Sequence, residues 1–155
     1  MTDLNWIAVT PEIVLLAMAC LVALVDLFVT CPQRKPTYYL TMLSLAGVAG
    51  LHLQALDSGA SVYAMQQMVV TDAMGHLLSL CATLAVMGSL VYAQTYAASR
   101  EMLKGELFSL SMFALLGISI MIIGNNFLAI YLGLELMSLS LYAVVALRRD
   151  HAQST

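Results

Sequence analysis

Charged residues are scarce in this sequence. Asp, Glu, Lys and Arg make up 10% of its 155 residues, whereas a typical soluble domain carries about 25%. Hydrophobic residues make up 61%. Such a chain cannot cover a folded surface with well-solvated groups, so a soluble globular domain is excluded and an integral membrane protein is predicted. The net charge is −3 and the sequence holds no basic patch, which argues against a nucleic-acid-binding protein.

Cysteine is also scarce, and the three cysteines, Cys20, Cys31 and Cys81, do not form a CxxC pair. An odd number at this spacing argues against a disulfide framework and against an iron–sulfur or zinc site. The glycine-rich fingerprint of a dinucleotide-binding fold is absent as well. We therefore expect this chain to bind no redox cofactor and no metal, and we interpret the cysteines as small apolar packing residues.

Five apolar stretches are present, and a helix of about 20 mainly apolar residues is long enough to cross a bilayer. We predict an all-α, polytopic transmembrane helix bundle that forms one membrane domain over residues 1–155. The second stretch contains Ala46 and Gly50, a spacing of small residues that would allow another helix to approach closely. The five predicted spans are residues 13–29, 38–56, 73–97, 107–123 and 126–147.

All six Lys and Arg residues lie outside the predicted spans. With five spans they fall on one side of the membrane, whereas the connections at 57–72 and 124–126 carry none. Because basic residues favour the cytoplasmic side, we predict an N-terminus outside the cell and a cytoplasmic C-terminus. The first span lacks the basic start of a signal peptide, so we expect it to be retained. The six residues are Arg34, Lys35, Arg100, Lys104, Arg148 and Arg149.

Several polar residues lie near the ends of the predicted spans. The connection at 57–72 begins with a turn signal and continues with Val and Tyr, which predicts a short strand or hairpin over the membrane surface. Asp72 and His76 are four residues apart on one helical face, and we expect an interfacial hydrogen-bonded pair. A proton entry point and a pair of metal ligands stay open as alternatives. We expect Asp26 to reach lipid headgroups or cap a neighbour, although it could join a polar path.

Glu135 is the one ionisable residue inside the last predicted span, and it lies near the middle. A charged group at that depth costs roughly 2.5 to 3.5 kcal/mol on insertion scales. At 100° per residue, Tyr131, Ser138, Tyr142 and Arg149 share its face. Such a stripe can hold water and pass protons, or Glu135 can be a neutral hydrogen-bonded contact between helices. Since no basic residue lies inside a span, Glu135 must be neutral, face water or pair with a group from outside this chain.

Two stretches carry a specific resemblance. The run GNNFLAIYLGLELMSLSLYAVVALRRD (124–150) resembles the fifth transmembrane helix of subunit N of the bacterial NADH:quinone oxidoreductase, respiratory complex I. The segment GELFSLSMFALLGISIMI (105–122) resembles the helix before it. Leu134 precedes the acid where the related antiporter-like subunits L and M have Trp, which favours subunit N. The chain resembles only the N-terminal third of such a subunit.

This resemblance implies a function. The family's fifth-helix acid, a proton-channel residue, matches Glu135, and its partner would be a lysine on a later helix, beyond Thr155. The implied activity is proton translocation coupled to electron transfer from NADH to quinone, in the bacterial inner (plasma) membrane. Partners would be lipid and the other membrane subunits, and NADH, FMN, iron–sulfur clusters and quinone would be bound outside this chain. A cation/proton antiporter subunit and a purely structural membrane subunit are the alternatives.

Overall fold

The computed structural model describes residues 5–29, 34–59, 61–99 and 105–147 of the chain. Within these residues there are five α-helices, each long and apolar enough to cross a membrane, and one two-stranded sheet. The prediction of an all-α bundle with five helices of membrane-spanning length is therefore confirmed, while its sidedness stays a prediction. In chain order the elements are α1 (Thr10–Phe28), α2 (Lys35–Ser58), β1 (Val62–Ala64), β2 (Val69–Thr71), α3 (Ala73–Ser99), α4 (Glu106–Ile123) and α5 (Phe127–Val145).

The helix ends follow from local sequence signals. Pro11 lies in the first turn of α1, where its missing N–H group costs no hydrogen bond. For the same reason Pro36 lies in the first turn of α2, although the sequence prediction placed it in a connection. Gly59 ends α2 with a φ of 60°, a left-handed conformation that glycine adopts easily. The side chain of Asn126 accepts a hydrogen bond from the Leu128 N–H group and so begins α5.

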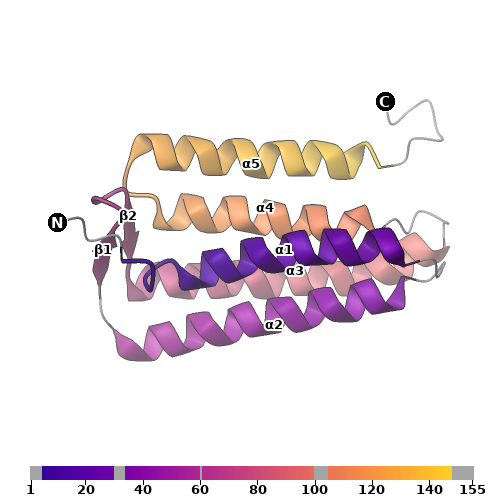
Figure 1. Ribbon diagram of the computed structural model, residues 1–155, viewed down its shortest axis with the longest axis horizontal. Coiled ribbons are helices and arrows are strands. Elements are labelled where there is room, and N and C mark those ends of the chain that lie inside the picture. The colour runs from indigo at the N-terminus through magenta and orange to yellow at the C-terminus, as the bar shows by residue number, and fades with distance from the viewer. Residues whose placement is uncertain (1–4, 30–33, 60, 100–104, 148–155) are drawn as a thin grey trace.

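The five helices lie side by side, and the hairpin lies at one end of the bundle (Figure 1). Side chains from α1, α2, α3 and α4 form the apolar core, in which Leu15, Leu45, Leu90, Phe108 and Leu115 are buried. Helix α4 has the largest buried share of the five spans and α5 the smallest. Because α5 packs mainly on the outer side of α4, most of its surface is not covered by the described residues.

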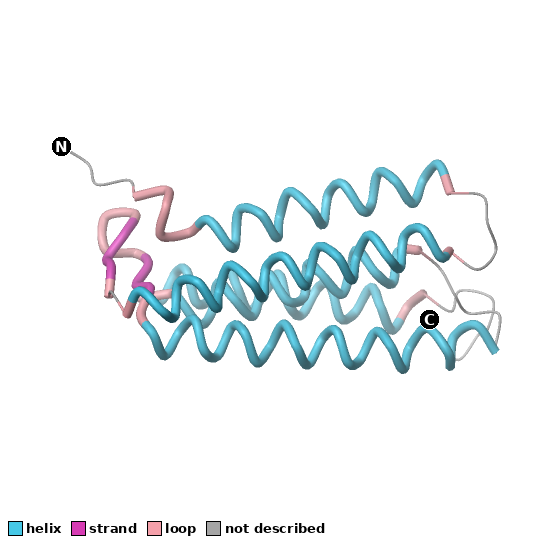
Figure 2. Tube along the Cα trace, turned by 90° about the horizontal axis from the view of Figure 1, so that it is seen from below, coloured by secondary structure: helices cyan, strands magenta, loops and turns pink. Residues whose placement is uncertain are grey.

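The predicted hairpin is confirmed. Strands β1 and β2 pair antiparallel, with Val62 opposite Thr71, and they close the end of the bundle where α2 ends and α3 begins (Figure 2). The backbone N–H of Asn125 donates to the Met68 carbonyl at 2.9 Å, and its side-chain amide donates to the Gln67 carbonyl at 2.9 Å. These bonds tie the hairpin to the turn between α4 and α5. We refer to this end of the bundle as the hairpin end.

Candidate functional site

The position of Glu135 follows from how α5 rests on α4. The buried residues of α5 are Ala129, Gly133 and Ser140, which form its contact face. At 100° per residue, Glu135 lies about 200° around the helix from Gly133. Glu135 is therefore on the side of α5 opposite α4. In Figure 1 that side is the outer surface of the bundle.

The predicted polar partners of Glu135 lie on the same open side. Tyr131 and Tyr142 are exposed, whereas Glu135 and Ser138 are partly buried. Arg149, the fifth member of the predicted stripe, lies outside the described residues. Glu135 makes no hydrogen bond or ion pair with any residue that the structure describes. Helices α1 to α4 thus do not supply the helix-to-helix contact that was the alternative interpretation of this acid.

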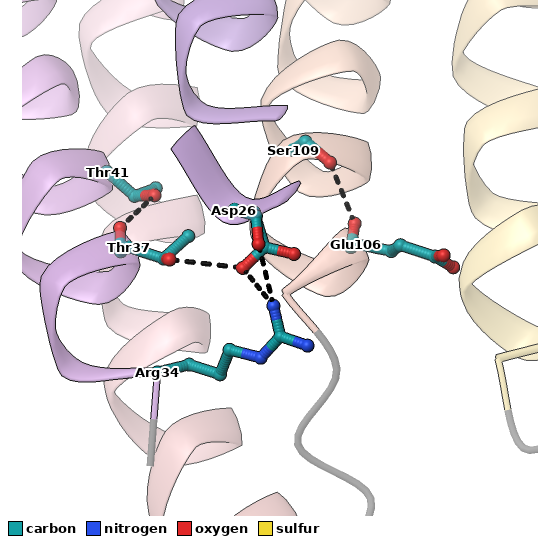
Figure 3. Close-up of polar contacts among 6 residues, drawn as sticks. All are labelled: Asp26, Arg34, Thr37, Thr41, Glu106 and Ser109. Carbon is teal, nitrogen blue, oxygen red and sulfur yellow. Dashed lines mark hydrogen bonds and ion pairs between the residues drawn. The ribbon is translucent and has the colours of Figure 1, made fainter. Parts of the chain in front are cut away.

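A second polar group lies at the opposite end of the bundle from the hairpin. The Asp26 carboxylate is 2.6 Å from the Arg34 guanidinium and accepts a hydrogen bond from the Thr37 hydroxyl at 3.1 Å (Figure 3). A Cβ atom at Gly105 would overlap this carboxylate. Asp26 therefore joins the end of α1 to the starts of α2 and α4, as expected of an acid that caps a neighbour. A cavity of about 270 Å³, lined in part by Glu106, lies beside it.

The expected side-chain pair of Asp72 and His76 is not formed. The Asp72 carboxylate instead accepts a hydrogen bond from the Gly75 N–H group at 2.7 Å and caps the start of α3. His76 pairs with His52 of α2, and their Nδ1 atoms are 3.2 Å apart. The sequence does not identify His52 as this partner, because helical spacing indicates only neighbours on the same helix.

The described residues contain no group of three or more His, Cys, Asp and Glu side chains that could hold a metal ion. Cys20 and Cys81 are free and exposed, and Cys31 lies outside the described residues. Among the residues that the structure describes, the ion pair Asp26–Arg34 lies at one end of the bundle and the pair His52–His76 at the hairpin end. Glu135 stands apart from both.

Fold and site together define a polytopic helical membrane protein whose outermost helix carries an acid and hydroxyl groups on its open face. The chain is 54% identical over 153 residues to NADH-quinone oxidoreductase subunit N of Polaromonas naphthalenivorans, which covers 98% of this chain and 31% of that protein. Identity is 47% to subunit N of Herminiimonas arsenicoxydans (98% of this chain, 32% of that protein). It is 46% to subunit N of Nitrosomonas europaea (94% and 30%).

The resemblance to subunit N of NADH-quinone oxidoreductase is thereby confirmed. The chain spans about a third of the length of these relatives. No family model matches the chain.

Proposed function

We propose that the chain is part of a membrane subunit of a proton-translocating NADH:quinone oxidoreductase, and that Glu135 takes up and releases the translocated proton. The observation that carries this proposal is the position of Glu135. It is an acid near the middle of a span, on the face of α5 that the described helices leave open. A charged side chain inside a membrane span costs free energy, and such residues normally have a functional partner.

The chemistry of the stripe suits a proton relay. A carboxyl group can hold or lose a proton, and the hydroxyl groups of Tyr131, Ser138 and Tyr142 can each donate and accept a hydrogen bond. They can therefore orient water beside Glu135 along the helix. A basic group from the rest of the subunit, packed on this face, would favour the ionised carboxylate, and its withdrawal would favour the protonated form.

In this proposal the chain contributes proton handling and no redox centre. NADH, FMN, iron–sulfur clusters and quinone would be bound by other parts of the complex. The partners of the chain would be the bilayer of the bacterial inner membrane and the neighbouring membrane subunits. The open face of α5 is where the remainder of the subunit would pack, because α5 contacts mainly α4 among the described elements.

The test compares Glu135→Gln with Glu106→Gln in the assembled complex. Both substitutions remove one acid and keep its shape, but Glu106 is exposed in the first turn of α4. NADH oxidation and proton uptake would be measured together in membrane vesicles. Glu135→Gln should lower the number of protons moved per NADH, while Glu106→Gln should not. Full pumping by Glu135→Gln would rule the proposal out.

A further inference from the structure

A cavity of about 370 Å³ opens at the hairpin end of the bundle, where α1 starts and α2 ends. Its lining includes the polar side chains of Thr10, Gln54, Ser58, Thr71 and His76. A volume of this size holds several water molecules, and hydroxyl and amide groups provide their hydrogen-bond partners. His76 is therefore in reach of water from this cavity.

The His52–His76 pair continues from the cavity into the bundle. His76 is 8% exposed and His52 is 1% exposed, so the second ring is fully enclosed. A distance of 3.2 Å between the two Nδ1 atoms fits a hydrogen bond in which one ring donates and the other accepts. In the neutral pair the donating ring then has a free lone pair on Nε2, and the accepting ring carries its proton on Nε2.

Three more polar side chains are buried at the same end without a partner among the described residues. They are Glu12 of α1, Ser79 of α3 and Ser119 of α4, which are 7%, 0% and 1% exposed. Both carboxyl oxygens of Glu12 and both hydroxyls are enclosed. Buried polar groups of this kind are costly unless they are hydrogen-bonded, and ordered water commonly satisfies them.

These side chains and the two histidines occupy one layer of the bundle. Each of the five lies within seven residues of the hairpin end of its helix, a depth of at most about 10 Å. The core residues Leu45, Leu90 and Phe108 lie further from this end, in the continuous apolar cluster. The layer therefore combines enclosed acceptors, a hydrogen-bonded imidazole pair and an opening to water.

We propose that the hairpin end of the bundle is a hydrated proton-exchange site, in which His52 and His76 pass protons between cavity water and an internal layer of water held by Glu12, Ser79 and Ser119. The site binds water and takes up protons from hydronium ions. The site deepens the proposed function, on which its role in pumping rests, and it is separate from the Glu135 stripe on α5.

One transfer can be written with all protons accounted for. A hydronium ion in the cavity gives its proton to the free Nε2 of His76, which becomes an imidazolium. The proton on its Nδ1 then moves to Nδ1 of His52, and His52 releases the proton on its own Nε2 to internal water. One proton has crossed the pair, and the two rings have exchanged tautomers. Each ring then returns to its first tautomer by exchanging protons with water: His76 loses the proton on Nε2 and gains one on Nδ1, and His52 loses the proton on Nδ1 and gains one on Nε2.

The charged groups around the pair favour a passing proton. The carboxylate of Asp72 lies at the start of α3, four residues before His76, and a negative charge at that position attracts a cation. Two further carboxyl groups lie at this end of the bundle. That of Glu12 on α1 is buried, and that of Asp57 near the end of α2 is exposed. The one ionisable residue within α4, Glu106, lies at the opposite end, as do the basic residues Arg34 and Lys35 among the residues described.

The site is tested first by spectroscopy on the chain in lipid bilayers. Histidines are labelled with ¹⁵N in a His151→Asn background, which leaves only His52 and His76. We expect a ¹⁵N–¹⁵N coupling across the Nδ1 atoms, and magnetisation transfer from water to both rings. In a second sample leucine is labelled with ¹⁵N, and the amide of Leu45 in the apolar core is the dry control. Absence of the coupling, or rings as dry as Leu45, would overturn the proposal.

The second test uses the assembled complex. His76→Phe should lower the protons moved per NADH, because it removes the ring that faces the cavity, whereas Ser44→Ala, buried in the opposite half of α2, should not. Full pumping by His76→Phe beside loss of pumping by Glu135→Gln would overturn this site and leave the proposed function standing. Full pumping by Glu135→Gln would remove the proposed function, and the spectroscopic result would then decide the site alone.

Discussion

Gly117 of α4 and Gly133 of α5 lie directly opposite each other, and the two helix backbones touch there. A Cβ atom on Gly117 would come within 2.7 Å of the Gly133 carbonyl, and one on Gly133 within 2.8 Å of the Gly117 carbonyl. Contacts of this kind between small residues are a common way for membrane helices to pack. This contact fixes the rotation of α5 and so turns Glu135 to the open side.

The first prediction concerns this contact. Gly133→Ala should destabilise the bundle by about 1–3 kcal/mol, because the added methyl group overpacks the interface between two backbones. Gly50→Ala is the matched control, since no other helix among the described residues lies within 4 Å of a Cβ built there, and it should leave stability within about 0.5 kcal/mol. Unfolding with SDS in mixed micelles measures both. Equal midpoints would show that α4 and α5 are not in backbone contact.

The same two glycines show what the sequence does and does not predict. The five spans and the hairpin follow directly from the sequence. A bilayer requires an apolar run of about 20 residues for each span, and turn signals between Val-rich segments predict a hairpin. The spacing of Ala46 and Gly50 would allow a close approach, yet no other helix among the described residues comes within 4 Å of a Cβ built at Gly50. A small-residue spacing states that an approach is possible and does not state which helix makes it.

The positions of the turns indicate which residues of two neighbouring helices lie at the same height along the bundle. Gly117 and Gly133 each lie eight residues from Asn125, the middle of the turn between α4 and α5. His52 and His76 each lie twelve residues from Ala64, in the connection between α2 and α3. Antiparallel neighbours joined by a short connection place such residues at equal height. The rotation of each helix is set by packing, so this symmetry alone does not predict contact. The open face of Glu135 likewise depends on that rotation.

The second prediction concerns the tie between α1 and α2. The pair Asp26–Arg34 is partly buried, so its coupling should lie between that of an exposed pair and that of a fully buried one, at about 1–2 kcal/mol. A double-mutant cycle with Asp26→Asn and Arg34→Gln measures this coupling. Lys35→Gln is the control, because Lys35 is exposed and forms no ion pair among the described residues. A coupling near zero would contradict a structural role for the pair.

The third prediction concerns sidedness. The connection that follows Gly59 should lie outside the cell, and Thr155 should lie in the cytoplasm. The reason is that all six basic residues fall on the same side of the membrane as Thr155, and basic residues favour the cytoplasmic side. Alkaline phosphatase inserted after Gly59 should be active, and a fluorescent protein fused after Thr155 should fluoresce. The insertion point avoids the hairpin, whose bonds to Asn125 hold the turn between α4 and α5. Activity of both reporters on one side would contradict the five-span topology.

The last prediction asks whether the stripe on α5 acts as a unit. Glu135→Gln should reduce the rate of proton translocation by about tenfold or more, since a positioned acid contributes at least that much to a proton-transfer step. Ser138 is on the same face as Glu135, one turn further along the helix. Adding Ser138→Glu to Glu135→Gln should therefore restore part of the rate, because the new carboxyl reaches the same water. Leu134→Glu in the same background is the matched control: Leu134 is exposed at nearly the same depth but lies about 100° away from Glu135 around the helix. An acid that merely needs to be present at this depth would rescue equally from both positions, and that result would show that the Tyr131–Ser138–Tyr142 face is not the proton path.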